Sequence, residues 1–237
     1  MQLDAVVPES PALVPQPTIA VVDVTFWGRE YGVCVFQSPT LKENLWWKET
    51  EHETADIYVD GRQALLIQGW TITGVVIDGR HGLIKAFVGI PVQICHFHQI
   101  KMVTRRITRH PKLPAAQELL SITYTLSRTT EIEFRTRLEK WYTHWEALLN
   151  ERTPCPCCPK KKWPYTHRKL RAAYRSMTTN LPYLFTFQKY PGLNLPNTTN
   201  SLDGMFSQIK NRLAVHRGLR RDRKYKLICE ILGGRKK

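Results

Sequence analysis

One segment near the N-terminus constrains the fold more than any other: a run of β-branched and aromatic residues that carries a single carboxylate. Residues 18–27 read TIAVVDVTFW, with Asp23 in the middle. Such a run is typical of a buried strand. A carboxylate buried there without a partner costs several kcal/mol or shifts its pKa. Asp23 therefore requires either a metal ion or a local hydrogen bond.

The segments that follow predict a mixed α/β sheet. Residues 31–36 (YGVCVF) form a second strand, which pairs with the first as a hairpin. The spacing of apolar residues predicts further strands at 44–49, 72–79 and 92–95, a helix at 55–69 and a short helix at 81–88. The first 98 residues thus give the order β-β-β-α-β-α-β.

A second acid, Asp78, ends the fourth of these strands. In open α/β sheets, ligands bind beyond the carboxyl ends of strands. For either acid alone, a turn or strand-end hydrogen bond is a sufficient explanation. Two acids on one predicted sheet of a basic protein favour a metal site, and Mg²⁺ prefers such oxygen ligands.

The rest of the chain reads as helices. We expect them at 100–110, 115–126, 130–149, 167–177, 202–213 and 221–232, with a turn-rich break at 191–197. Asp203 falls in the first turn of the helix at 202–213, where a carboxylate also complements the helix dipole. The aromatic residues Trp141, Tyr142 and Trp145 could stack on bases, but core packing is the favoured interpretation.

Charge separates the two parts of the chain. Residues 1–100 contain 6 Lys and Arg against 11 Asp and Glu, whereas residues 101–237 contain 29 against 9. This excess predicts a polyanionic partner, with nucleic acid ahead of an anionic membrane surface or a basic surface without a partner. No apolar run approaches the length of a membrane span, which is about 20 residues, and residues 1–17 lack the features of a signal peptide.

Cysteine usage favours a reducing compartment. Cys34 and Cys229 stand in apolar settings typical of small core residues. Cys155, Cys157 and Cys158 lie close together, but no second Cys/His pair follows at zinc-finger spacing. A reduced loop without metal is therefore the favoured reading of that cluster.

Four motifs in order resemble a known family. They are VVDVTFWGREYGVCVF, VVIDGRHGLIKAF, the run from Cys95 to His98, and NTTNSLDGMFSQIKNRLAVHRGL. Together they resemble the Mutator-type insertion-sequence transposases, which are DDE/D recombinases with a ribonuclease H-like catalytic domain. The resemblance spans roughly residues 18–232. It implies an α/β fold with a ribonuclease H-like mixed sheet and a large all-helical insertion before the last catalytic helix.

The resemblance also implies the site and the reaction. Asp23, Asp78 and Asp203 would be the catalytic, metal-binding acids, and Cys95 and His98 would form a C-x-x-H pair beside them. Two Mg²⁺ ions, for which Mn²⁺ could substitute, would support DNA cleavage and strand transfer. The family's third acid is usually Glu, whereas this chain has Asp203. Mg²⁺ demands near-ideal geometry, so the shorter side chain bears on activity.

The resemblance divides the chain into a flexible lead-in at 1–17, the first part of the catalytic domain at 18–98, a helical insertion at 99–196 and C-terminal helices that complete the domain at 197–237. Family members usually carry a DNA-recognition region before the first strand, so we expect that region to be missing. The chain would then be either an active transposase domain or a truncated, catalytically impaired DNA-binding remnant. A structure-specific nuclease is a third reading.

DNA is the expected partner, with a homodimer in the DNA complex, no membrane and no small-molecule substrate. The expected location is cytoplasmic and nucleoid-associated, in a bacterium or archaeon. Basic side chains after the C-x-x-H pair and around the third acid would contact DNA phosphates. These predicted contacts are Arg105, Arg106, Arg109, Arg168, Lys169, Arg171, Arg175, Lys210, Arg212, Arg217, Arg220 and Arg221.

Overall fold

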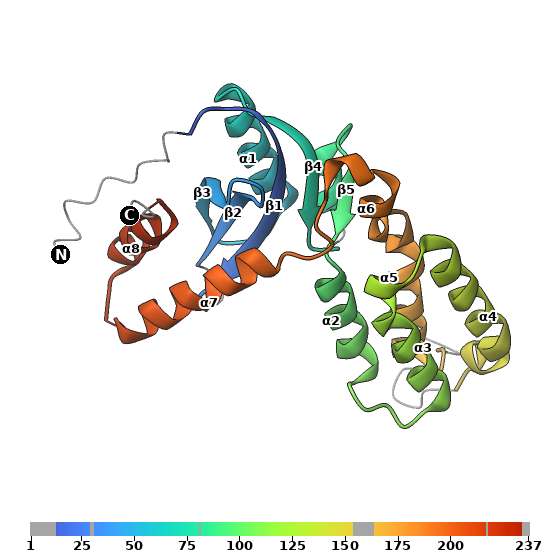
Figure 1. The fold of residues 1–237 in the computed structure, drawn as a ribbon. Helices are drawn as coiled ribbons and strands as arrows, with labels where there is room; N and C mark the ends of the chain where they lie inside the picture. The colour runs from blue at the N-terminus through green and yellow to red at the C-terminus, as the bar shows by residue number, and fades with distance from the viewer. Residues whose placement is uncertain (1–12, 29–30, 81, 154–163, 217, 234–237) are drawn as a thin grey trace.

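The computed structural model describes residues 13–28, 31–80, 82–153, 164–216 and 218–233. Their centre is a five-stranded mixed sheet with strand order β3-β2-β1-β4-β5 (Figure 1). The strands are β1 (Pro17–Phe26), β2 (Gly32–Ser38), β3 (Glu43–Thr50), β4 (Thr71–Ile77) and β5 (Val92–Ile94). The first three strands are antiparallel to one another in the order β1-β2-β3, while β4 runs parallel to β1 and β5 parallel to β4. The predicted hairpin and the predicted order of strands along the chain are confirmed.

Alternation along β1 separates the two faces of the sheet. Ala20 and Val22 belong to the core beneath helix α1 (Ala55–Ile67), whereas Ile19 and Val21 belong to the core beneath α7 (Asn200–Val215) and α8 (Arg221–Gly233). Because successive side chains of a strand point to opposite faces, Asp23 shares the face of Val21. The period of the strand therefore directs the buried acid toward α7.

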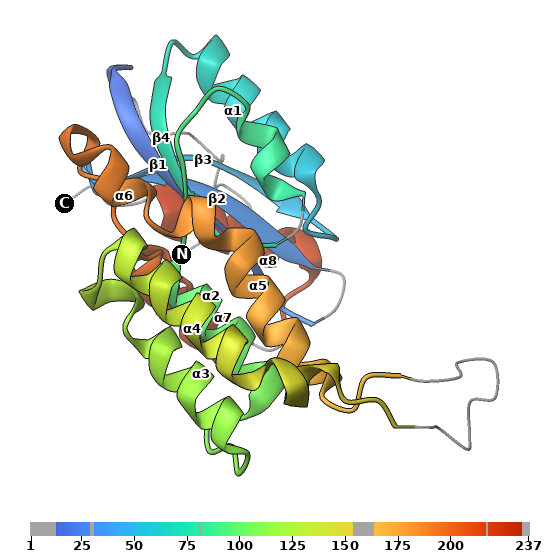
Figure 2. The ribbon, with the colours of Figure 1, turned by 90° about the vertical axis from the view of Figure 1, so that its right-hand side faces the viewer.

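A separate group of helices lies beyond β5 and packs around its own apolar core (Figures 1 and 2). Its elements are α2 (His96–Ile107), α3 (Pro114–Tyr124), η3 (Leu126–Arg128), α4 (Glu131–Asn150), α5 (Arg168–Leu184), α6 (Thr186–Lys189) and η4 (Pro191–Leu193). Trp141 is 3% exposed, and its Nε1 donates to the carbonyl oxygen of Ala115 at 2.9 Å. Core packing, the favoured reading of Trp141, is confirmed.

Three predicted elements differ from those observed. Helix α5 ends at Leu184 rather than Met177. Helix α2 begins at His96 rather than Ile100, because the chain turns directly out of β5 and the His96 N–H donates to the carbonyl oxygen of Asn197 at 2.9 Å. The helix predicted at 81–88 is the 3₁₀ helix η2 (Leu83–Phe87). Gly82 and Gly89 flank η2 with φ of 95° and 82°, in the left-handed region that favours glycine. These two backbone conformations end the helix on both sides and keep it short.

Every helix in the described ranges is too short or too polar to cross a lipid bilayer.

Candidate metal centre

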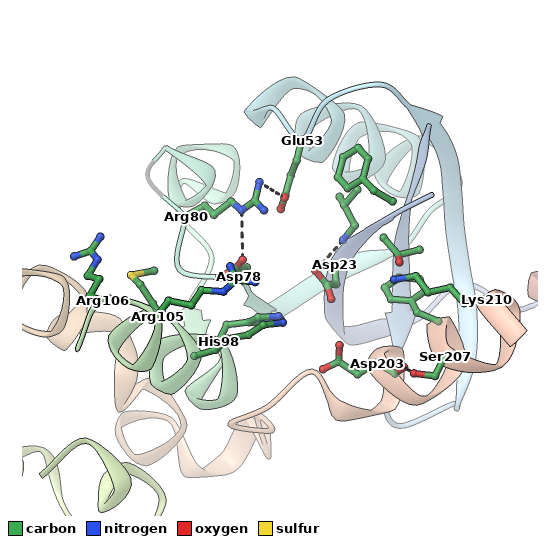
Figure 3. A pocket seen from close by; sticks show the side chains of 16 residues that line it. Asp23, Glu53, Asp78, Arg80, His98, Arg105, Arg106, Asp203, Ser207 and Lys210 are labelled. Carbon is green, nitrogen blue, oxygen red and sulfur yellow. Dashed lines mark hydrogen bonds and ion pairs between the residues drawn. The ribbon is translucent and has the colours of Figure 1, made fainter. Parts of the chain in front are cut away.

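Three side chains from three separate elements meet at the carboxyl end of β1. Asp23 comes from β1, His98 from the first turn of α2 and Asp203 from the first turn of α7. Each offers a ligand atom, and these atoms lie within 4.8 Å of one another. Figure 3 shows the three side chains converging on one space. A separation of this size allows a single cation to touch all three.

The three residues are not satisfied by hydrogen bonds alone. Asp23 Oδ1 accepts from the Val24 N–H at 2.9 Å. Asp203 Oδ2 and His98 Nδ1 are buried and have no hydrogen-bond partner in the described part of the chain. A buried polar atom left in this state costs about 1–3 kcal/mol. A bound divalent cation would satisfy the carboxylates, so the residues fit a metal centre.

Burial and mutual charge shift the pKa values of this group. Burial is the main cause that raises the pKa of Asp23 from an ordinary 3.8 to about 7, and the nearby Asp203 and Glu53 add to it while His98 opposes it. Burial lowers the pKa of His98, but contact with Cys95 and the charges of Asp78 and Asp23 outweigh it and raise that pKa to about 9. Without a cation, His98 therefore carries a proton at neutral pH.

Asp78 lines the same cavity but lies outside the three-residue cluster. Its Oδ2 faces Arg80 Nε at 3.5 Å, and Arg80 Nη1 forms an ion pair with Glu53 Oε2 at 2.6 Å (Figure 3). The predicted role of Asp78 as a metal ligand stays a prediction. The guanidinium group of Arg80 thus lies between Asp78 and a fourth acid, Glu53.

This fourth acid, Glu53, was not identified as a candidate site residue in the sequence analysis. Its side chain is 3% exposed and accepts a hydrogen bond from the Tyr58 hydroxyl at 2.7 Å. In sequence, Glu53 stands two residues before α1, a place where acids commonly complement the helix dipole. Only its burial against the cavity distinguishes it from such an acid.

The two helices that carry His98 and Asp203 are joined at their first residues through one sulfur atom. Cys95 is the N-cap of α2, Thr199 is the N-cap of α7, and both are fully buried. The Thr199 N–H and hydroxyl group lie 3.3 and 3.4 Å from Cys95 Sγ, which accepts from both. The two residues of the predicted C-x-x-H pair remain in contact: His98 reaches the cluster, while Cys95 also accepts hydrogen bonds from the start of α7.

Basic side chains line the cavity around the acidic residues. The cavity has a volume of about 480 Å³, and its lining includes Lys101, Arg105 and Arg106 from α2 and Lys210 from α7. Lys101 and Arg105 follow His98 at positions i+3 and i+7, and Lys210 follows Asp203 at i+7. Each basic residue therefore stands on the same helix face as the cluster residue of its own helix. Acids at the centre of the cavity could hold a metal ion, and the basic side chains around them could bind the phosphates of a polyanion.

The other predicted DNA contacts differ in their surroundings. Arg171 donates to the Leu149 carbonyl oxygen at 2.7 Å and lies over the ring of Tyr165, and Arg221 forms ion pairs with Glu49 and Glu51. Both guanidinium groups thus serve packing within the chain. Six further residues are exposed: Arg109, Arg168, Lys169, Arg175, Arg212 and Arg220. Arg217, Cys155, Cys157 and Cys158 lie outside the described residues.

The raised pKa of His98 predicts a pH-dependent cation affinity. A cation that uses the imidazole must displace its proton, so the Mn²⁺ association constant is expected to rise about tenfold per pH unit between pH 7 and pH 9 and then level off. Below pH 7 Asp23 must lose a proton as well, so the rise is steeper there. Proton binding to His98 also stabilises the cation-free fold below pH 6.5, and this contribution is lost as the pH rises to about 9. Mn²⁺ titrations between pH 6.5 and 9.5 measure the first effect, and thermal unfolding without cation measures the second. A pH-independent affinity would contradict a role for His98 as a ligand.

Comparisons with known proteins add no assignment: no family model matches this chain, and no curated protein matches it either.

Proposed function

We propose that this chain is the catalytic domain of a DDE/D-type DNA transposase that cleaves DNA and transfers strands with the help of divalent cations. The observation that carries the proposal is the convergence of Asp23, His98 and Asp203 in a cavity with a basic surround. These residues come from segments up to 180 positions apart. The Mutator-type resemblance names the same three residues, two as catalytic acids and one as the histidine of its C-x-x-H pair.

The topology supports a ribonuclease H-like reading of the sheet. Three antiparallel strands lead into β4 and β5, which run parallel to β1 on its other side. Asp23 near the end of β1 and Asp78 just after β4 therefore lie at the same edge of the sheet. The helical group from α2 to η4 stands between β5 and the helix that carries Asp203, where the resemblance implies an insertion.

The residues of the cavity would have two roles in the reaction, metal binding and phosphate binding. Asp23, His98 and Asp203 would hold one divalent cation, and Asp78 with Asp23 a second. When bound, such ions polarise the phosphate and lower the pKa of an attacking water. Lys101, Arg105 and Lys210 would bind the phosphates on either side of the cleaved bond. Because imidazole joins the carboxylates, the donor set suits Mn²⁺ as well as or better than Mg²⁺.

The proposal extends to the partners. DNA would be bound mainly through phosphates, so affinity should fall steeply with salt. A homodimer would join two element ends, and the site would act in the nucleoid of a bacterial or archaeal cytoplasm.

The test is nicking of supercoiled plasmid by the full chain with Mg²⁺, Mn²⁺ or EDTA. The expected result is nicking with either cation, none with EDTA and a faster rate with Mn²⁺. Asp60→Asn serves as a control, because Asp60 is an exposed acid on α1 that pairs with Lys48 outside the cavity. Cleavage that persists in EDTA would contradict the proposal.

A second function, DNA binding without catalysis, is favoured by one observation. Asp78 lies outside the cluster and faces Arg80 instead. Plasmid binding without nicking in any cation would establish this impaired form of the protein.

A further inference from the structure

The guanidinium group of Arg80 lies among the acids of the cavity. Arg80 reaches Glu53 at 2.6 Å and Asp78 at 3.5 Å, and all three residues line the cavity that holds Asp23, His98 and Asp203. We propose that Arg80 is a gate on Asp78: its guanidinium holds Asp78 in the free protein and turns to a backbone phosphate when nucleic acid enters, which frees Asp78 to ligate a cation. This inference rests on the proposed function.

The structure divides the region into a fixed part and a movable part. A Cβ at Gly79 would lie 2.9 Å from both Asn180 Nδ2 and Ile94 Cγ2, so the backbone between Asp78 and Arg80 is tightly packed. The Arg80 side chain is 55% exposed, whereas that of Glu53 is 3% exposed. The guanidinium group can therefore rotate toward the open cavity while the backbone stays in place.

The two contacts of Arg80 are unequal. The pair with buried Glu53 is short, while the pair with Asp78 has the length of a loose ion pair without a hydrogen bond. While Nη1 stays paired with Glu53, Nε and Nη2 can donate two parallel hydrogen bonds to a phosphate, which makes the phosphate a stronger partner for this edge of the guanidinium group than one carboxylate oxygen at 3.5 Å. Lys101, Arg105 and Lys210 line the same cavity and would attract that phosphate.

Release of Asp78 would change the number of cations that the site can hold. The Asp23, His98 and Asp203 cluster is already assembled without nucleic acid. Asp78 adds a further carboxylate only when Arg80 no longer neutralises it. The free chain should therefore bind one divalent cation tightly, and the chain bound to nucleic acid should bind two.

The experiment counts Mn²⁺ bound per chain, from the electron paramagnetic resonance signal of free Mn²⁺, with and without a short DNA duplex whose own Mn²⁺ binding is subtracted. The natural chain is expected to bind one Mn²⁺ alone and two with DNA. Arg80→Gln is expected to bind two without DNA, with affinity at the second position raised at least about tenfold. Arg62→Gln is the matched control, because Arg62 donates to the Ala86 carbonyl oxygen outside the cavity.

Asp78→Asn identifies the ligand in the same assay. With DNA present, this variant should bind one Mn²⁺ where the natural chain binds two. Two ions on the natural chain without DNA, or one ion on Arg80→Gln, would overturn the gate. Nicking by the natural chain together with either result would leave the proposed function in place. A natural chain that binds no Mn²⁺ would overturn both.

Discussion

Asp23→Asn is expected to abolish cation-dependent DNA nicking, with a fall in rate of about 10³-fold or more. Asp23 is the residue that would touch both cations, and it is 7% exposed in the middle of the site. Asn keeps the shape of the side chain but removes the negative charge that attracts a divalent cation. The measurement is the initial rate of plasmid nicking in Mn²⁺, with Asp60→Asn beside it.

The same substitution is expected to stabilise the cation-free protein. Burial raises the pKa of Asp23 to about 7, so folding favours its protonated form and the ionised form opposes folding above that pH. The protonated Asp23 carboxyl group contributes to stability below pH 3.8, and this contribution is lost as the pH rises to about 7. At pH 8, Asp23→Asn should raise the free energy of unfolding by as much as about 4 kcal/mol.

Thermal unfolding at pH 8 in EDTA measures this gain. Added Mn²⁺ should stabilise the natural chain and leave Asp23→Asn almost unchanged, because only a chain that binds the cation gains stability from it. A variant that nicks normally, or one that Mn²⁺ stabilises as strongly as the natural chain, would show that Asp23 is not a ligand.

Asp203→Asn is expected to reduce nicking by a similar factor of about 10³. Asp203 Oδ2 is buried without a hydrogen-bond partner in the described residues, and its carboxylate stands within 4.8 Å of the ligand atoms of Asp23 and His98. Loss of its charge removes one of three ligands and leaves the rest of α7 intact. The Kd for Mn²⁺ should rise together with the loss of rate.

Asp203→Glu tests whether the shorter acid is a defect. The aspartate already reaches the cluster, so an extra methylene would move the carboxylate away from the other two ligand atoms. We expect the Mn²⁺ affinity to fall about tenfold, the equivalent of about 1.4 kcal/mol. A rise in activity above the natural chain would instead show that Asp203 limits catalysis. Asp60→Glu is the control, since it makes the same change at an exposed acid that pairs with Lys48 outside the cavity.

The sequence by itself predicted most of the helices and strands and marked Asp23 as a candidate ligand. Period-two and period-3.6 patterns predicted the succession of strands and most of the helices along the chain, since both depend on local burial that residue type reports directly. The order of the strands within the sheet came from the structure. Asp23 was recognisable because a lone carboxylate in TIAVVDVTFW conflicts with its apolar neighbours. Asp203 could not be separated from a helix-start acid without the family resemblance.

Only the tertiary structure decided which residues meet. It brought His98 rather than Asp78 to Asp23 and Asp203, joined Cys95 to Thr199 and set Arg80 against a fourth acid, Glu53. These contacts link positions that are distant in the chain, and they depend on how α2 and α7 pack against the sheet. The pattern of one segment reports its own burial but not the distance to another segment, so the composition of the site followed from packing.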